Sequence, residues 1–292
     1  MIYVINFADK RFAQQQHDNT LSAYEKGKAD KVIEYHPEDI DEEFIKANPG
    51  VFSFMDRGYG LWIWKSYFIL KTLKLMTEDD YLFYCDSGSY FVNDIHHLTK
   101  VMDEKHLTIM PFELPFLEMQ WTKLEAYKKI GVTDFSRNQV LAGFILIKKS
   151  KFSVDFFTEW KNYMCDLVCS SPEMQTDLPN FANFIAHRED QAVFSLLVHK
   201  YGLEVFRDPS QLGDWPWLYK TDDRIILNIH PYTNSPYPRI IVSNRRVAAK
   251  KYRRSMLLKD FANAFGLFRI LYLLKHKLLK KITSVPLKRD DY

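Results

Sequence analysis

The chain is poor in cysteine and has no long apolar run, and both absences restrict what it can be. It has three cysteines in 292 residues and no CxxC pair, so neither a disulfide framework nor a paired-thiolate metal site is predicted. So few cysteines are typical of a protein in a reducing cytoplasm. No stretch of 18 uncharged apolar residues occurs and the N-terminus lacks a basic start, so we predict neither a membrane span nor a signal peptide.

Glycine is absent from residues 6–16, the segment that follows the first predicted strand. A nucleotidyltransferase normally carries a glycine-rich phosphate loop near its first strand. This absence counts against that class of enzyme. The chain also shows no internal repeat and no low-complexity tract, which excludes repeat architectures.

Aromatic residues are abundant and charge is unevenly distributed. Aromatics reach 15% of the chain, which suits either a wide core or sites that stack bases and sugar rings. Residues 245–292 hold 14 Lys and Arg against three Asp and Glu, which leaves 26 against 34 in residues 1–244. An acidic body with a basic tail implies that the tail meets something anionic.

Apolar residues recur near helical spacing among the basic residues of the tail. We therefore expect a basic amphipathic helical tail over residues 245–292 that lies on an anionic membrane surface. A helix packed on the body, or a dimer contact, is the alternative. No recognised nucleic-acid-binding motif is present, so we expect no nucleic-acid partner.

Short apolar runs alternate with helical patterns through residues 1–244. Strands are predicted at residues 2–7, 31–35, 81–86, 107–110, 142–147, 203–206 and 224–229. Helices are predicted at residues 9–28, 61–76, 152–168 and 189–201, and residues after 110 are predicted to form a loop that contains two prolines. This alternation predicts an α/β fold with one domain over residues 1–244.

The strand that ends at residue 86 carries the strongest functional signal. Asp86 ends an apolar run and is followed by Ser87 and Gly88. A carboxylate at the end of a buried strand is costly unless it meets a cation or a donor, and this edge of an open α/β sheet is where ligands bind. Asp86 is therefore the first candidate functional residue, with a turn-forming aspartate as the alternative.

Two neighbouring motifs resemble a known family. Residues 57–67, Arg-Gly-Tyr-Gly-Leu-Trp-Ile-Trp-Lys-Ser-Tyr, precede Tyr-Cys-Asp-Ser-Gly at residues 84–88. Together they resemble bacterial glycosyltransferases of the GT-A type, particularly those that build capsule and lipopolysaccharide. The resemblance implies a GT-A-like, Rossmann-type mixed sheet flanked by helices that binds a nucleotide-sugar donor. The donor-binding residues that it implies are Asn6, Phe7, Asp9, Arg57, Lys65, Asp86, Ser87 and Gly88.

The resemblance leaves the use of a metal open. Many GT-A enzymes hold Mn²⁺ or Mg²⁺ with an Asp-x-Asp motif, because oxygen ligands suit a hard cation that neutralises the leaving diphosphate. In this chain Gly88 stands where the second aspartate would be. The implied metal ligands are Asp86 and His230, which follows the strand predicted at residues 224–229.

Further site residues follow from the same resemblance. Asp190 opens the helix predicted at residues 189–201, and we expect it to contact the sugar or the acceptor, with Glu189 as the alternate. In an inverting enzyme either carboxylate could be the general base, and stabilisation by the helix dipole is the structural alternative. Small residues permit close approach of a ligand or of the backbone. The residues implied beside the sugar pocket are Gln139, Ala142 and Gly143.

These expectations describe a hexosyltransferase-like glycosyltransferase. It would move a sugar from a nucleotide-diphosphate sugar to a saccharide or lipid-linked saccharide acceptor in surface polysaccharide synthesis. We expect a cytoplasmic enzyme, peripheral at the inner face of the plasma membrane. The alternatives are a nucleotidyltransferase and a non-catalytic scaffold of a polysaccharide-assembly complex, and the missing second aspartate favours the scaffold. Donor, acceptor and stereochemistry are not fixed by the sequence.

Overall fold

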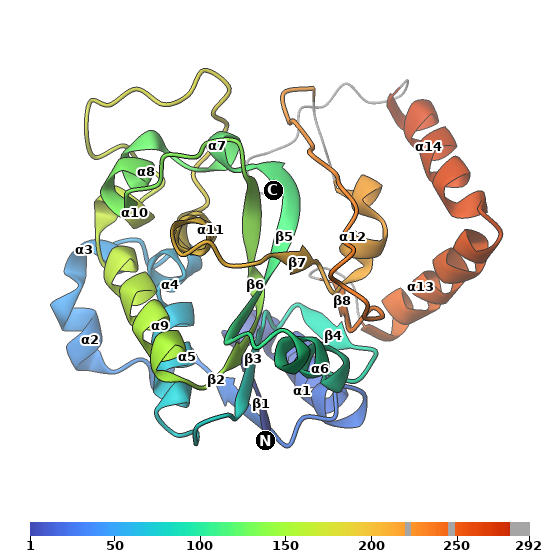
Figure 1. Ribbon diagram of the computed structural model, residues 1–292, viewed down its shortest axis with the longest axis horizontal. Helices are drawn as coiled ribbons and strands as arrows, with labels where there is room; N and C mark the ends of the chain where they lie inside the picture. The colour runs from blue at the N-terminus through green and yellow to red at the C-terminus, as the bar shows by residue number, and fades with distance from the viewer. Residues whose placement is uncertain (220–222, 245–248, 281–292) are drawn as a thin grey trace. The chain divides into compact units, whose positions relative to one another are not determined.

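The computed structural model describes residues 1–219, 223–244 and 249–280, and Figure 1 labels its elements. Contacts divide the chain into two compact units, Met1–Ser243 and Asn244–Tyr292. Within its described residues the second unit consists of α13 (Ala249–Ala264) and α14 (Leu267–Lys280). None of the helices in the described ranges combines the length and apolar character needed to cross a membrane. The basic residues at 245–248 and 281–292 lie outside the described residues.

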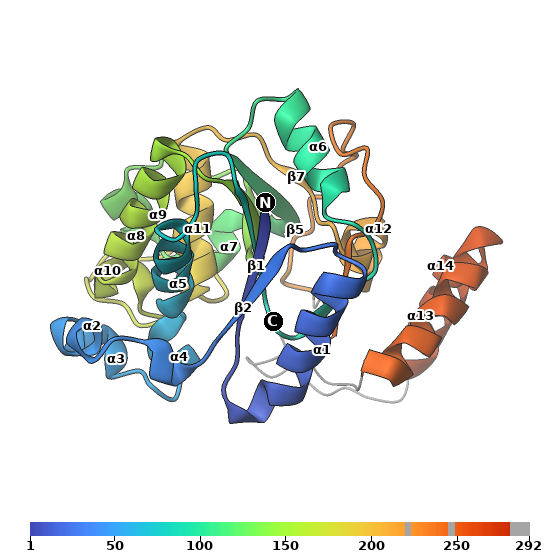
Figure 2. The same cartoon turned by 90° about the horizontal axis from the view of Figure 1, so that it is seen from below.

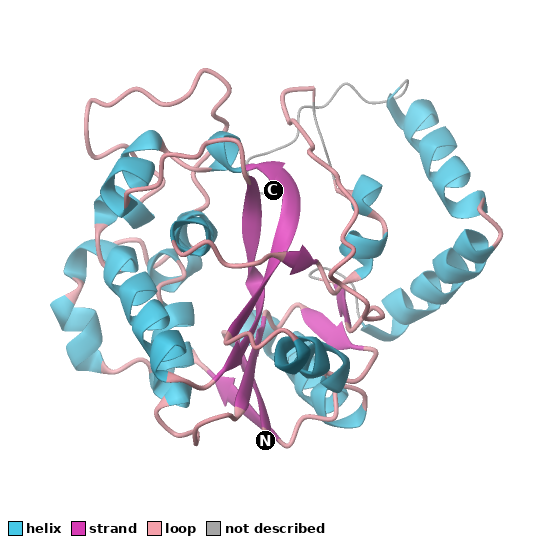
Figure 3. Cartoon of the chain, in the orientation of Figure 1, coloured by secondary structure: helices cyan, strands magenta, loops and turns pink. Residues whose placement is uncertain are grey.

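A six-stranded mixed sheet forms the centre of the first unit, in the order β2-β1-β3-β6-β5-β7 (Figure 3). Its strands are β1 (Ile2–Phe7), β2 (Lys31–Tyr35), β3 (Tyr81–Cys85), β5 (Ile109–Leu117), β6 (Asn138–Lys148) and β7 (Phe206–Arg207). Strand β6 is antiparallel to its neighbours β3 and β5, whereas the other pairs are parallel. The carboxyl ends of the five parallel strands therefore meet the amino end of β6 at one edge.

Helices cover both faces of the sheet because successive strand residues point to opposite sides. In β3, Leu82 and Tyr84 join one apolar cluster, whereas Phe83 and Cys85 join another. The first cluster includes α5 (Trp64–Leu73), α9 (Lys151–Met164) and α11 (Glu189–Lys200). The second includes α1 (Ala13–Glu25) and α6 (His96–Glu104). Figure 2 shows these two groups on opposite sides of the sheet. The α/β fold class predicted from the sequence is confirmed.

Shorter elements complete the described part of the first unit. A second sheet pairs β4 (Ser89–Phe91) with β8 (Ile241–Ser243) in antiparallel register. The remaining helices are η1 (Lys10–Phe12), η2 (Pro37–Asp39), α2 (Glu42–Ala47), α3 (Pro49–Phe52), α4 (Gly58–Leu61), α7 (Glu118–Trp121), α8 (Leu124–Ile130), α10 (Leu167–Ser170), α12 (Gln211–Asp214) and η3 (Pro216–Leu218).

The prediction of a loop after residue 110 is wrong, because β5 continues through both prolines to Leu117. The pairing of β5 with β6 shifts register after Pro111 and again after Glu113. Proline cannot donate to a regular ladder, but it is tolerated at such irregularities. The strand therefore extends to the site edge, and its last residue is followed directly by Glu118.

The strand predicted at residues 224–229 is also absent. In this segment the structure contains only an isolated bridge between Leu227 and Phe116. The buried amide of Gln120 replaces ladder bonds there, since it donates to the Arg224 carbonyl at 2.7 Å and accepts from the Ile226 N–H at 2.8 Å. His230 consequently follows a loop and not a strand.

Candidate active site

Three predicted site residues from distant segments meet at the carboxyl edge of the sheet. The Lys65 ammonium lies 2.8 Å from Asp190 Oδ2 and 3.5 Å from Asp86 Oδ1. The hydroxyl of Tyr84 donates to Asp86 Oδ1 at 2.6 Å. The side chains of Lys65 and Asp190 are 7% and 8% exposed, whereas that of Asp86 is 23% exposed. Asp86 is thus the member of this ion-pair cluster that solvent or a ligand reaches most easily.

The secondary structure explains how the ion-pair cluster assembles. Lys65 lies in the first turn of α5, Asp86 follows β3, and Asp190 lies in the first turn of α11. The Trp160 indole donates to the Asp190 carbonyl at 3.3 Å, and the Lys65 ammonium donates to the Ala142 carbonyl at 3.5 Å. Burial raises the pKa of the Asp190 carboxyl, although the Lys65 ammonium opposes this shift. The Lys65 ammonium is thus held by two carboxylates and a backbone carbonyl. The Trp160 indole holds the backbone of Asp190.

Gly143 allows the close approach that the sequence predicted. Its carbonyl accepts from the Asp86 N–H at 2.9 Å. A Cβ added at residue 143 would lie 3.0 Å from Asp86 Oδ2, which is closer than most Cβ atoms approach a neighbour. A larger residue here would crowd the Asp86 carboxylate.

Arg57, which precedes a strained segment, contacts the start of the same helix as Asp190. Its guanidinium pairs with Glu189 Oε1, with Nη2 at 2.7 Å and Nε at 2.8 Å. Residues 58–62 all have positive φ, and three of them are not glycine. Glu189 also has a positive φ of 32°. In residues other than glycine such conformations cost of order 1–3 kcal/mol each and tend to cluster at functional sites. One partner of this ion pair, Glu189, therefore lies on strained backbone, and the other, Arg57, directly precedes a strained segment.

Gln139 has a different place from the one predicted. The sequence placed it beside the sugar, but the side chain is fully buried. Its Oε1 accepts from Arg188 Nη1 at 3.0 Å and from Gln191 Nε2 at 2.8 Å. Gln139 therefore holds Arg188 and Gln191, the residues on either side of Glu189 and Asp190. Its own side chain is closed off from solvent.

Sequence reasoning missed Glu118, a fully buried carboxyl directly behind Gln139. The hydroxyls of Thr122 and Ser195 donate to it. Burial raises the pKa of Glu118 from its usual 4.5 to about 8, although these hydrogen bonds oppose the shift. A signal was available, because Glu118 follows β5 as Asp86 follows β3, but it depended on recognising the proline-containing strand.

A cavity of about 740 Å³ opens where β1 and β2 end. Its charged and aromatic lining comprises Asp9, Lys10, Arg11, His36, Glu38, Asp56 and Tyr59. Asp9 caps η1 by accepting from the Arg11 N–H at 2.9 Å, and its carboxylate also pairs with the Arg11 guanidinium. Asp9 and Asp86 follow the ends of neighbouring parallel strands, so the cavity and the ion-pair cluster lie along one sheet edge.

Asn6 and Phe7, which were predicted to bind the donor, do not line this cavity. The Asn6 amide is buried and donates to Asn19 Oδ1 at 2.8 Å. The Phe7 ring is stacked on Trp64 with centroids 3.9 Å apart. These side chains therefore pack at the end of β1, and their direct contact with a donor stays a prediction.

The two residues implied as metal ligands, Asp86 and His230, contact different side chains. His230 Nε2 lies 2.9 Å from Glu113 Oε2, while Asp86 is engaged by Tyr84 and Lys65. Within the described ranges no group of three or more His, Cys, Asp or Glu side chains could hold a metal ion. The described side chains therefore do not fit the complete ligand shell of a divalent cation.

Ser87 and Gly88 form the turn between β3 and β4.

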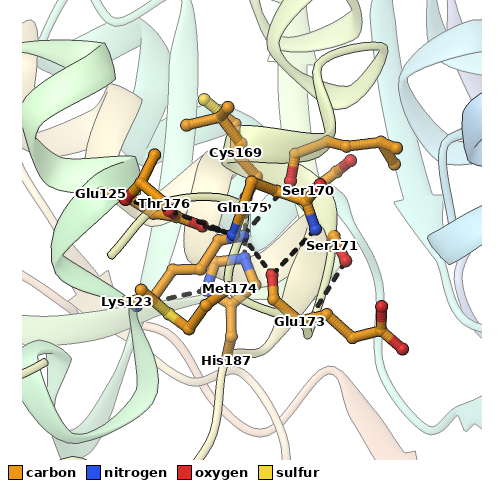
Figure 4. A network of polar contacts seen from close by, with 12 residues as sticks. Lys123, Glu125, Cys169, Ser170, Ser171, Glu173, Met174, Gln175, Thr176 and His187 are labelled. Atoms are coloured by element: carbon orange, nitrogen blue, oxygen red, sulfur yellow. Dashed lines mark hydrogen bonds and ion pairs between the residues drawn. The ribbon is translucent and has the colours of Figure 1, made fainter. Parts of the chain in front are cut away.

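A buried ion pair anchors the loop that leads to Glu189 and Asp190 (Figure 4). Lys123 and Glu125 are almost completely buried, with Nζ 2.7 Å from Oε1. Lys123 donates to the Glu173 carbonyl at 3.0 Å, and Glu125 accepts from the N–H of Gln175 at 3.0 Å. At the other end of the loop, His187 lies 2.7 Å from the Cys169 carbonyl. The loop is thus fixed at both ends, which holds the start of α11 in place.

No protein-family model matches the sequence, and no curated protein was found to be similar to it. Solved structures are similar. The galactosyltransferase LgtC, in complex with donor and acceptor sugar analogs, has a TM-score of 0.48 and 14% identity over 83% of this chain and 86% of that one. Mouse xyloside xylosyltransferase 1 has a TM-score of 0.43 and 11% identity over 84% and 98%. Both are glycosyltransferases, the class that the sequence motifs resemble, but similarity at this level assigns no role to any residue.

Proposed function

We propose that the chain is a glycosyltransferase that moves a sugar from a nucleotide-diphosphate sugar to a saccharide or lipid-linked saccharide in surface polysaccharide synthesis. The observation that carries this proposal is the ion-pair cluster of Lys65, Asp86 and Asp190 at the carboxyl edge of the sheet. It lies one strand away from the end of β1, where Asp9 lines the large cavity.

The cavity has the properties that a nucleotide requires. Its volume of about 740 Å³ falls within the roughly 300–1,000 Å³ of small-molecule sites. Lys10 and Arg11 can offset phosphate charge, and Tyr59 offers an aromatic ring against which a base can stack. The diphosphate would then extend toward Asp86 and Lys65.

The proposed transfer requires one bond to form and one to break. The acceptor oxygen bonds to the anomeric carbon, the bond from that carbon to the diphosphate oxygen breaks, and the hydroxyl proton passes to a carboxylate. Asp190 is the better catalytic candidate, because it shares the ion-pair cluster with Asp86, whereas Glu189 pairs with Arg57. Burial raises the pKa of Asp190, which favours proton transfer near neutral pH. Fixed charges and orientation supply the remaining catalysis.

A thermal-shift screen tests the proposal with UDP-, GDP-, CMP- and dTDP-sugars, each with and without Mn²⁺. A donor at 100 times its Kd should stabilise the protein by about 2.7 kcal/mol. Asp86→Asn should remove the shift, and Gly143→Ala should weaken donor binding, since its Cβ would lie 3.0 Å from Asp86 Oδ2 and crowd the carboxylate. Gly50→Ala is the matched control, because its Cβ would meet only the Leu167 side chain. If none of these nucleotide-sugars stabilised the protein, the proposed transfer from a nucleotide-sugar would be wrong.

The exposed apolar side chains and the positive charge of the second unit support the proposal that the protein attaches peripherally to the inner face of an anionic membrane. Large apolar side chains of α13 and the following turn, Leu257, Leu258, Phe261 and Phe265, are 65–72% exposed. Residues 245–292 carry 14 basic against three acidic residues, and each basic residue near an anionic surface contributes about 1 kcal/mol. An exposed apolar surface with a strong positive charge is the combination that binds the headgroup region.

Vesicle sedimentation tests this attachment with the full-length chain. The protein should sediment with vesicles that contain phosphatidylglycerol and much less with pure phosphatidylcholine, and added salt should release it. Phe261→Glu with Phe265→Glu should reduce binding at least tenfold, whereas Leu75→Glu, at a 63% exposed residue of the first unit, should not. Equal binding to neutral and anionic vesicles would contradict the proposal.

A further inference from the structure

A second cavity, of about 140 Å³, lies where β5 and β7 approach the same edge of the sheet. It is bounded by Glu113 of β5, by Arg207 and Asp208 at the end of β7, and by residues 228–232. At about 30 Å³ per water molecule, this volume equals roughly five waters. It therefore has room for one small ring but not for an extended chain.

Glu113 supplies an acceptor atom that the described protein leaves unused. The side chain is 8% exposed. Its Oε2 accepts from the Tyr232 hydroxyl at 2.5 Å, lies 2.9 Å from His230 Nε2, and receives a longer contact from Asn138 at 3.4 Å. Within the described ranges no residue donates to Oε1. Oε1 is not closed off from solvent, so a ligand that brings a hydroxyl group can reach this acceptor.

The charged side chains that line the cavity all contact other groups of the protein. Glu113 is paired with His230, and Arg207 Nη1 lies 2.5 Å from Asp214 Oδ1. Asp208 accepts from the Ser210 N–H at 2.7 Å and from the Tyr219 hydroxyl at 3.1 Å. Arg207 is bound by both Asp214 and the Tyr237 carbonyl, and the lining also carries the carboxyl groups of Glu113 and Asp208. An uncharged ligand therefore suits the cavity better than an anion.

The remaining lining combines aromatic and apolar surfaces with these polar groups. The rings of His230 and Tyr232 lie 4.6 Å apart, and Pro115, Pro216 and Ile229 add apolar walls. A sugar ring has one apolar C–H face and a rim of hydroxyls, so it matches a mostly apolar site with a few placed polar groups.

We propose that this cavity binds one uncharged sugar ring of the acceptor saccharide, with Glu113 Oε1 accepting a hydrogen bond from a ring hydroxyl. The proposal rests on the proposed function, and it adds the class of ligand and the residues that recognise it. It also gives His230 and Tyr232 a role, since both hold Oε2 and so leave Oε1 directed to the ligand. Donor and acceptor would then occupy two cavities at one edge of the sheet.

Saturation-transfer NMR on the full-length protein tests this site with methyl β-galactoside, methyl β-glucoside and methyl N-acetyl-β-glucosaminide. At least one glycoside should bind. Glu113→Gln should weaken its binding at least tenfold, and His230→Ala, at a half-exposed residue that is safer for folding, should weaken it about fivefold. His96→Ala is the matched control, because His96 is an exposed histidine paired with Asp94 and should leave binding unchanged.

The donor-induced rise in melting temperature is measured on the same proteins. If the donor binds but no glycoside does, or if glycosides bind wild type and both cavity variants alike, the sugar site is wrong and the proposed function stands. Binding of inorganic phosphate in place of the glycosides would also overturn the site. If the wild type binds no donor, the proposed function itself fails.

Discussion

Replacing Lys65 with methionine should destabilise the protein by about 3–5 kcal/mol and abolish donor binding. Removing one partner of a buried ion pair leaves the other charge uncompensated, and this costs about that amount. Here the loss would leave Asp86 and Asp190 near each other without their shared cation. Because Asp190 can escape the repulsion by taking up a proton, the destabilisation should be larger at pH 8 than at pH 5. Urea unfolding at the two pH values measures it.

A double variant separates the effect on folding from the effect on binding. Lys65→Met with Asp190→Asn removes both buried charges, so most of the lost stability should return while donor binding stays absent. Lys71→Met is the matched control, because Lys71 lies on the same helix but pairs with an exposed aspartate, and it should unfold close to wild type. A Lys65→Met protein that unfolds at the wild-type urea concentration would show that the buried ion pair contributes nothing.

Residues whose role depends on local sequence could be found without the structure. Asp86 follows an apolar run and precedes a small turn, and this pattern alone places it at the end of a strand. Lys65 and Asp190 lie in the first turns of helices that the periodicity predicted. Since these elements alternate in an α/β fold, their ends converge on one edge of the sheet.

Residues whose role depends on tertiary contacts could not be found in this way. Nothing in the sequence near Gln139 indicates that it is buried beneath Arg188 and Gln191. The prolines of β5 made its second half look like a loop, so neither the strand end nor Glu118 after it was predicted. The irregular pairing that accommodates these prolines depends on the neighbouring strand β6. The sequence predicted that His230 follows a strand at residues 224–229. In the structure, hydrogen bonds with the buried amide of Gln120 take the place of strand pairing there.

The stability of the protein should fall as the pH rises from 6.5 to 8, and Glu118 should cause much of this fall. Its pKa is about 8 in the folded protein and near 4.5 when unfolded, so the folded state binds more protons in this range and loses stability as pH rises. At about 1.4 kcal/mol per pKa unit, the whole shift from 4.5 to about 8 is worth about 5 kcal/mol, of which roughly 2 kcal/mol is lost between pH 6.5 and 8. Burial lowers the pKa values of His187 and His199 to about 3 and 4. Their opposite effect on stability continues through the unfolded pKa of 6.5, so its last part offsets some of this fall up to about pH 7.5.

Glu118→Gln provides the test, because an amide imitates the size and neutrality of the protonated acid. The variant should lose less stability than wild type between pH 6.5 and 8, as measured by urea unfolding at closely spaced pH values. Glu104→Gln alters an exposed carboxylate and should keep the wild-type slope. If Glu118→Gln kept that slope too, the buried carboxyl would already be ionised at neutral pH. A negative charge would then lie behind Gln139, next to the residues that flank Asp190.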